Sequence, residues 1–313
     1  TFFITLLFLT GAPVIFHSHR HIMFVDYIPF LIMLLISVKS YMEGKGRLWH
    51  ITVISLLLVT TSFYFSVGSF IVTGIYAIML YIEKTDTKAL REHIKAAFSD
   101  VMPVVAAVSA GVCMAGILLI PTLSALLSGR QETQGGFDAG MLAPSLKGEF
   151  LLYGPYSMGM SAISIYGVIW SFFDKRKGAG ANRFFAVILG LLAVFPIFVY
   201  LLNGGLYLDG KVLIPFLLPA LYVTAPFVAE LFSLGGEGLK EGEAENKEGS
   251  FKKTFAIGTA ICIILFIAGL DKYERLAHLA EVIPLAVCLF IYMKNKKPKT
   301  VLVPFGAIAI LVC

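Results

Sequence analysis

Charged residues are scarce in this chain, and their scarcity excludes an ordinary soluble domain. Only 14% of the 313 residues are charged and 58% are hydrophobic, whereas an average soluble domain has about 25% charged and 45–50% apolar residues. The net charge of +5 does not indicate a nucleic-acid-binding protein, because the basic residues are spread between apolar runs rather than gathered together.

Cysteines at metal-binding or redox spacing are missing as well. All four cysteines lie inside apolar stretches without a C-x-x-C spacing, so we expect buried and inert thiols. No charged region or cleavage site of a signal peptide precedes the first apolar run. Because the chain starts at Thr1 and stops at Cys313 within apolar runs, we expect a fragment that lacks both ends of a longer protein.

Long apolar runs dominate what is present. A run of about 17–25 residues crosses a hydrocarbon core of roughly 30 Å as a helix. We expect about eleven transmembrane helices, which cover approximately 2–16, 24–38, 49–65, 67–82, 101–123, 157–173, 184–202, 212–232, 254–270, 279–293 and 301–313. The predicted fold class is therefore an all-α polytopic membrane protein.

The polar loops between these runs separate by charge. If the loops alternate strictly between two sides, 19 of the 25 Lys and Arg residues fall on one side and six on the other. Short cytoplasmic loops carry the excess of basic residues, so the first set is predicted to be cytoplasmic. The chain then begins on the cytoplasmic side.

Two predicted cytoplasmic segments differ from plain loops. Residues 87–98 place apolar and basic side chains on different helical faces, which fits a short helix in the membrane interface or a connector packed on its neighbours. Residues 234–250 are rich in Gly, Glu and Lys, so we expect a flexible linker there. It divides the chain into a main bundle over 1–233 and truncated C-terminal helices over 251–313.

The first predicted extracytoplasmic loop contains three histidines at a spacing of two, followed by an acid. Residues 17–21 read HSHRH, and Asp26 starts the next apolar run. Histidines at this spacing share one face only in an extended chain, so His21 is interpreted as a contact to substrate or lipid phosphate, with a metal ligand or a solvated loop as alternatives. Asp26 is either a helix-start residue or an acid facing a cavity.

Two other outer loops contain candidate binding groups. Residues 203–211 (NGGLYLDGK) combine turn residues with an aromatic ring and a cation, so Asn203, Tyr207 and Lys211 are candidate substrate contacts. Interface anchoring is the alternative for the last two. The longer loop 128–156 contains Arg130, which could hold a phosphate in two hydrogen bonds or remain an unpaired rim residue.

Four stretches together resemble the bacterial YfhO family, whose members are placed among the polytopic glycosyltransferases of the GT-C fold. They are residues 21–30 (HIMFVDYIPF), 59–65 (VTTSFYF), 116–126 (GILLIPTLSAL) and 203–216 (NGGLYLDGKVLIPF). The last stretch is the most specific of the four. The resemblance runs in order along most of the chain.

The resemblance implies a multi-pass enzyme of the bacterial cytoplasmic membrane that works on the extracytoplasmic face. It would transfer a sugar from a polyprenyl-phosphate carrier to a cell-envelope acceptor, such as the lipoteichoic-acid class of polymer. No cofactor or metal is expected, although a divalent cation stays an alternative. Family members keep a catalytic carboxylate in their first outer loop, and here no acid precedes Asp26, so the catalytic acid is expected outside this fragment. A lipid-linked saccharide flippase or transporter and a non-catalytic scaffold partner are the competing hypotheses.

Overall fold

The computed structural model describes residues 2–85, 90–129, 137–233, 241–270 and 272–295. The helices are α1 (Phe2–Leu9), α2 (Ala12–Arg20), α3 (Ile28–Met42), α4 (Leu48–Thr61), α5 (Phe63–Lys84), α6 (Leu90–Met114), α7 (Gly116–Gly129), α8 (Ala162–Phe173), α9 (Ala179–Val194), α10 (Pro196–Leu202), α11 (Leu217–Ser233), α12 (Glu241–Ala268) and α13 (Lys272–Asn295). Four short 3₁₀ helices join them: η1 (Ile22–Phe24), η2 (Ala139–Leu142), η3 (Gly148–Phe150) and η4 (Gly210–Phe216). The described residues form no strand beyond an isolated bridge, so the all-α prediction is confirmed.

Among the described residues, five continuous helical stretches are long and apolar enough to cross a membrane. They are Ile22–Met42, Phe63–Lys84, Ala97–Met114, Gly210–Leu231 and Gly249–Ile267. The pairs α1–α2 and α9–α10, bent by 50° and 97°, raise the number to seven if each pair is one span. Large apolar side chains such as Ile36 and Ile120 are exposed on these and neighbouring helices, as in a protein whose helices face lipid. The chain is therefore membrane-embedded.

The expected eleven separate spans are not confirmed among the described residues. Helices α4 and α8 have 14 and 12 residues, so they extend only about 21 and 18 Å at a rise of roughly 1.5 Å per residue. The run 184–202 is broken between α9 and α10, where Pro196 cannot continue the preceding helix. The run at 301–313 lies outside the described residues.

Two local expectations are corrected. The segment 90–98 does not form a helix of its own, because α6 continues from Leu90 through Pro103 to Met114; residues 87–89 lie outside the description. Residues 241–250, expected in a flexible linker, form the beginning of α12. This segment is rich in Glu, Ala and Lys, which favour helix without needing burial. Residues 234–240 are not described.

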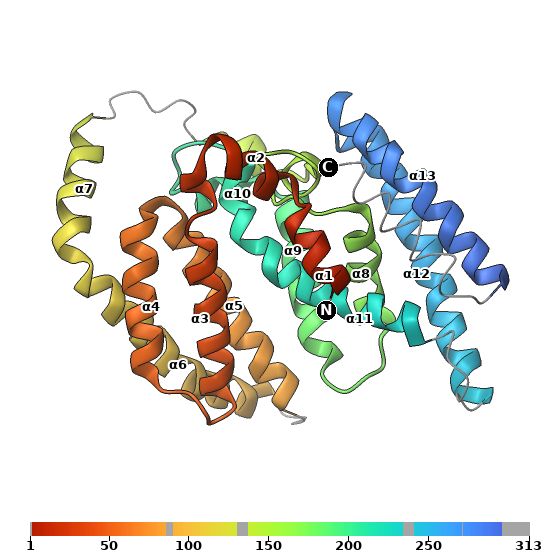
Figure 1. Cartoon of the computed structure of the whole chain (residues 1–313), viewed down its shortest axis with the longest axis horizontal. Helices are drawn as coiled ribbons and strands as arrows, with labels where there is room; N and C mark the ends of the chain where they lie inside the picture. The colour runs from red at the N-terminus through yellow and green to blue at the C-terminus, as the bar shows by residue number, and fades with distance from the viewer. Residues whose placement is uncertain (1, 86–89, 130–136, 234–240, 271, 296–313) are drawn as a thin grey trace.

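Helix α8 is at the centre of the larger packed core. Its Tyr166 and Trp170 are buried and lie beside Phe227 of α11. Gly167 lets α8 approach α11 closely, since a Cβ there would lie 2.7 Å from the Cα of Thr224. In the same way Gly258 of α12 faces the ring of Tyr166. In Figure 1, α12 and α13 lie together beside α8, and α7 lies at the opposite edge.

The loops gather at two ends of the bundle. Helices α2 and α10 lie toward the top of Figure 1, and the loop between α3 and α4 lies toward the bottom. At the lower end Nζ of Lys84 donates to the carbonyl oxygen of Met42 at 3.4 Å, and Gly178 packs against Glu83. These segments all belong to the set that is predicted to be cytoplasmic. We call this the inner end and the opposite one the outer end; which end faces the cytoplasm stays the prediction of the Lys/Arg distribution.

Candidate functional site

The loop 203–211 lies against the start of α5 at the outer end. The hydroxyl of Tyr207 donates to that of Tyr64 at 3.1 Å, and the Tyr64 hydroxyl donates to Oδ1 of Asn203 at 2.8 Å. This short hydrogen-bond chain connects two segments about 140 residues apart in sequence. The predicted residues Asn203, Tyr207 and Lys211 therefore all lie next to Tyr64.

Lys211 lies over two aromatic rings. Its Nζ is 5.0 Å from the ring centroid of Tyr207 and 5.4 Å from that of Tyr64. It also lies 3.4 Å from Oδ2 of Asp209, and its side chain is 22% exposed. This ion pair is longer than the roughly 2.7–2.9 Å of a charge-assisted hydrogen bond. The ammonium is therefore partly desolvated and only loosely paired, which suits exchange for an incoming anion.

Backbone requirements explain much of the loop sequence. Gly204 and Gly205 both have φ of +71°, in the left-handed region that glycine enters without strain. The buried side-chain amide of Asn203 donates to the carbonyl oxygens of Val199 and Asp209 at 3.0 and 2.8 Å. Asn203 therefore holds the loop in shape, and the groups that it leaves available to a ligand are Tyr207 and Lys211.

A second part of the outer end is built from the histidine segment. His17 is fully buried, stacks on Phe24 at a ring distance of 4.5 Å, and its Nε2 donates to the carbonyl oxygen of Pro155 at 2.7 Å. Because a carbonyl oxygen only accepts, Nε2 carries the proton. His21 is exposed, with its ring 5.8 Å from that of Phe24. His17 and His21 therefore differ in environment despite their spacing.

Aromatic contacts join the two parts. The ring of Phe24 is 5.1 Å from that of Phe65, and Phe65 is 4.8 Å from Tyr64. On the other side Tyr156 packs against His17 at 5.2 Å. The predicted residues His21, Asn203, Tyr207 and Lys211 therefore belong to one continuous outer cluster, together with the aromatic residues Phe24, Tyr64, Phe65 and Tyr156.

Asp26, another predicted site residue, is not among the residues that make these contacts. Asp26 follows η1 and is half-buried, and its Oδ1 is buried without a hydrogen-bond partner. The adjacent Tyr27 is fully buried and stacks on Phe65 at 4.9 Å. Arg130 lies outside the described residues.

Metal chelation by the histidine segment is not supported by its conformation. Residues 12–20 are helical, so successive histidines at a spacing of two lie on different faces, and His17 is buried while His19 is exposed. Within the described ranges no group of three or more His, Cys, Asp or Glu side chains is placed to hold a metal ion.

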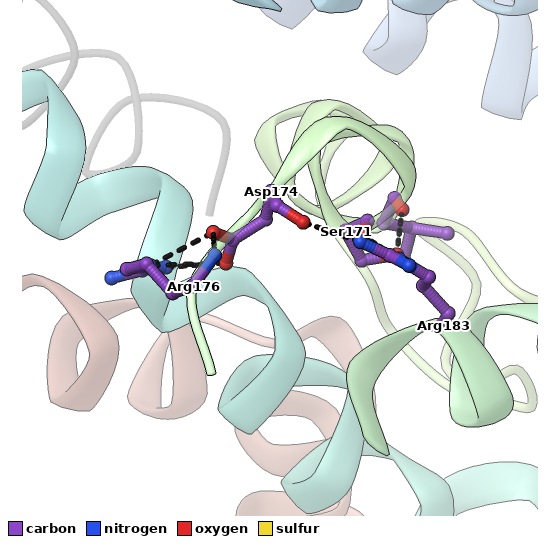
Figure 2. Close-up of polar contacts among 5 residues, drawn as sticks. Ser171, Asp174, Arg176 and Arg183 are labelled. Atoms are coloured by element: carbon purple, nitrogen blue, oxygen red, sulfur yellow. Dashed lines mark hydrogen bonds and ion pairs between the residues drawn. The ribbon is translucent and has the colours of Figure 1, made fainter. Parts of the chain in front are cut away.

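A contrasting charged cluster lies at the inner end, between α8 and α9. Figure 2 shows Asp174 between two arginines. Arg176 donates to both carboxylate oxygens of Asp174 at 2.7–3.0 Å, and Nε of Arg183 donates to the carbonyl oxygen of Ser171 at 3.0 Å. Burial alone would raise the pKa of Asp174, but the hydrogen bonds from Arg176 outweigh it and lower that pKa. The cluster thus caps the end of α8.

Sequence reasoning missed Tyr64 and Tyr156 as site residues. Tyr64 lies in the stretch 59–65, at the start of α5, and an aromatic residue there is ordinarily interpreted as an interface anchor. Tyr156 lies in a loop that the sequence marks as polar and long. Nothing in the local pattern indicates that both approach the loop 203–211, where the Cβ of a residue replacing Gly210 would lie 2.9 Å from the Tyr156 carbonyl oxygen.

Comparisons with known proteins provide no identification. No family model, no curated protein and no solved structure matches the chain. The resemblance to the YfhO family is therefore a hypothesis that the four sequence stretches alone support.

Proposed function

We propose that this chain is part of a membrane glycosyltransferase that takes a sugar from a polyprenyl-phosphate carrier on the extracytoplasmic face. The acceptor would be a cell-envelope glycopolymer of the teichoic-acid type. The observation that carries the proposal is the position of Lys211, a loosely paired cation over two tyrosine rings at the end of two apolar helical segments.

The chemistry of such a donor matches this arrangement. A polyprenyl tail stays in lipid, so its phosphate lies at headgroup depth, where a cation at a helix end can reach it. As the sugar leaves, negative charge builds up on the phosphate, and a fixed ammonium stabilises that charge. Tyr64 and Tyr207 would shield the ammonium from water and offer ring faces to the sugar. Arg130 is proposed as a second cation.

The reaction also needs a carboxylate that takes the proton from the acceptor hydroxyl. Asp26 is the candidate within the chain, because one of its oxygens is buried without a partner. The resemblance instead implies an acid in a preceding loop, so Asp26 is proposed for this role only as the weaker option.

One assay separates this proposal from a transporter. A transporter moves its substrate between compartments and leaves it chemically unchanged. We expect the full-length protein, purified in detergent without a second compartment, to consume a polyprenyl-phosphate sugar when a glycopolymer acceptor is added. Binding of the donor without its consumption would contradict the enzyme proposal and favour a transporter or a scaffold.

A further inference from the structure

The structure buries a second polar cluster between α12, α13 and the loop 148–161. His278 and Glu281 of α13 are 1% and 3% exposed. The hydroxyl of Tyr153 lies 3.1 Å from Nδ1 of His278, and Nε2 of His278 lies 3.0 Å from the carbonyl oxygen of Cys262 on α12. Ionisable side chains buried among membrane helices are costly, and such groups usually have a function.

Glu281 has one clear structural role. Its Oε2 accepts the backbone N–H of Ala162 at 2.9 Å, at the first residue of α8. An anion or a hydrogen-bond acceptor is favoured at a helix N-terminus. Capping explains why an acid is present there, but it does not explain why the carboxyl group also lies beside the Tyr153 hydroxyl, which in turn contacts His278.

The hydrogen-bond partners limit where the protons can be. The Cys262 carbonyl oxygen only accepts, so Nε2 of His278 carries a proton. Burial, followed by the nearby Glu281 carboxylate, raises the pKa of Tyr153 well above its usual range, so its hydroxyl stays protonated. That single proton can be donated to Nδ1 of His278 or to Glu281, but not to both.

The Ser161 hydroxyl also contacts the Glu281 carboxyl group, and two proton arrangements keep the whole cluster neutral. If Tyr153 donates to a neutral His278, a neutral cluster requires a protonated Glu281, whose hydroxyl can donate to the tyrosine oxygen. If Tyr153 donates to an ionised Glu281, Nδ1 of His278 must carry a second proton and donate to the tyrosine oxygen. Both arrangements contain the same number of protons and have zero net charge, which burial favours over an unpaired carboxylate.

We propose that Tyr153, His278 and Glu281 form a proton-binding site, which holds one shared proton at neutral pH and ties the loop 148–161 to α12 and α13. Among the described residues, the other titratable groups that face it are the thiol of Cys262, the hydroxyl of Tyr166, which bonds to Thr259, and the carboxylate of Glu274, which approaches Gly154. The proposal does not depend on the glycosyltransferase activity.

Loss of the shared proton affects the loop directly. It leaves a buried carboxylate without a compensating positive charge, and Tyr153 can then donate to only one of its two partners on α13, so the contact between Tyr153 and α13 weakens. The same loop contains Pro155, whose carbonyl oxygen bonds to His17, and Tyr156, which packs on the outer cluster. The proton site is thus connected through one short loop to the outer end of the bundle.

Nuclear magnetic resonance tests the proton count directly. The full chain is reconstituted in lipid bilayers with ¹⁵N-labelled histidine and ¹³C-labelled glutamate, and the two signals are assigned at neutral pH with the variants His278→Gln and Glu281→Gln. We expect either a protonated Glu281 beside a singly protonated His278 or an ionised Glu281 beside a doubly protonated His278. An ionised Glu281 beside a singly protonated His278 would overturn the proposal.

Amide hydrogen exchange tests the tie between this site and the loop. The backbone amides of Leu152, Met158 and Met160 are hydrogen-bonded within this loop. In the wild type we expect their exchange rates to increase at alkaline pH, after correction for the intrinsic pH dependence of amide exchange. Glu281→Gln keeps an acceptor for Ala162 and a donor for the tyrosine oxygen, so its exchange should not depend on pH. The same acceleration in both proteins would contradict the proposal.

Discussion

The inner and outer ends of the bundle use the same short motif in different ways. Asp174 and Arg176 at the inner end, and Asp209 and Lys211 at the outer end, are each an acid followed two residues later by a cation. In both, Oδ1 of the aspartate accepts the backbone N–H of the cationic residue at 3.0 Å. The local turn is therefore the same, and the surroundings make the difference.

At the inner end the acid is buried and fully engaged. The Asp174 side chain is 4% exposed, and both of its oxygens accept from the guanidinium of Arg176. At the outer end the acid is 33% exposed and the cation, 22% exposed, is the more shielded partner; it lies 3.4 Å from the acid and over two tyrosine rings. The first pair is a closed salt bridge in the loop between α8 and α9, whereas the second leaves a cation that is available to bind a ligand. An acid–cation motif therefore indicates function only when its packing is known.

The largest expected effect tests whether the two ends face opposite sides of the membrane. Single cysteines replace Leu206 at the outer end and Lys45 at the inner end, in a background without the native cysteines; both positions are exposed. Because the Lys/Arg distribution assigns these loops to opposite sides, an impermeant thiol reagent added outside intact cells should label Leu206→Cys and leave Lys45→Cys unlabelled. Equal labelling of both cysteines from one side would show that the two ends of the bundle do not face opposite sides of the membrane.

The next effect concerns catalysis at the outer end. If Lys211 contacts the donor phosphate, Lys211→Ala should lower kcat/KM about ten- to a thousandfold, from roughly 1.4–4 kcal/mol for a lost charge-assisted contact. Lys211→Arg should keep part of the activity, because it keeps the positive charge. The measurement is steady-state turnover of the polyprenyl-phosphate sugar.

Lys147→Ala is the matched control for this experiment. Lys147 lies in another outer loop and pairs with Glu149 at 3.2 Å, with its side chain 35% exposed. We expect its loss to leave kcat/KM nearly unchanged, since partly exposed pairs contribute little. Wild-type turnover in a well-folded Lys211→Ala protein would show that Lys211 only anchors the chain at the interface.

The smallest effect concerns stability at the inner end. Asp174→Asn should lower the free energy of unfolding by about 1–2 kcal/mol, because a charge-assisted contact is lost but Arg176 is half-exposed and regains water. The measurement is thermal unfolding in detergent. Glu43→Gln, which breaks an exposed pair with Lys45, should change the free energy of unfolding by only about 0.5 kcal/mol or less.

The inner pair also predicts a pH dependence of stability. The folded-state pKa of Asp174 is lowered, so its stabilisation is complete above the unfolded value of about 3.9 and is lost as the pH falls through the folded value. The difference in unfolding temperature between wild type and Asp174→Asn should therefore shrink as the pH falls below about 4. A difference that stays constant over this range would assign the effect of the substitution to packing.

Part of this architecture could be predicted because it depends on local sequence. Helix is found at ten of the eleven predicted apolar runs, and the eleventh lies outside the described residues. The number of spans could not be predicted in the same way. A run of apolar residues does not show where Pro196 bends a helix by 97°, or that α4 and α8 are too short to cross alone.

The candidate site also has a part that could be predicted from local sequence and a part that could not. The residue types of the loop 203–211 already indicated a turn with an aromatic ring and a cation, and that is how the loop is built. Tyr64, by contrast, lies about 140 residues away, and no periodicity connects it to Lys211. Likewise no local pattern connects Glu281 to Tyr153, because the tyrosine approaches His278 and Glu281 only when α13 packs on the loop 148–161.

The sequence by itself determined that this is a helical membrane protein and which residue types occupy its loops. Both follow from short-range causes: apolar runs must leave water, and their backbones must form internal hydrogen bonds in lipid. Only the tertiary structure decided which of two similar acid–cation turns is closed by Arg176 and Arg183 and which leaves Lys211 over two tyrosine rings. The reason is that burial and pairing depend on helices far apart in the chain, whose mutual approach is set by close packing at Gly167 and Gly258 and at the bends between helices.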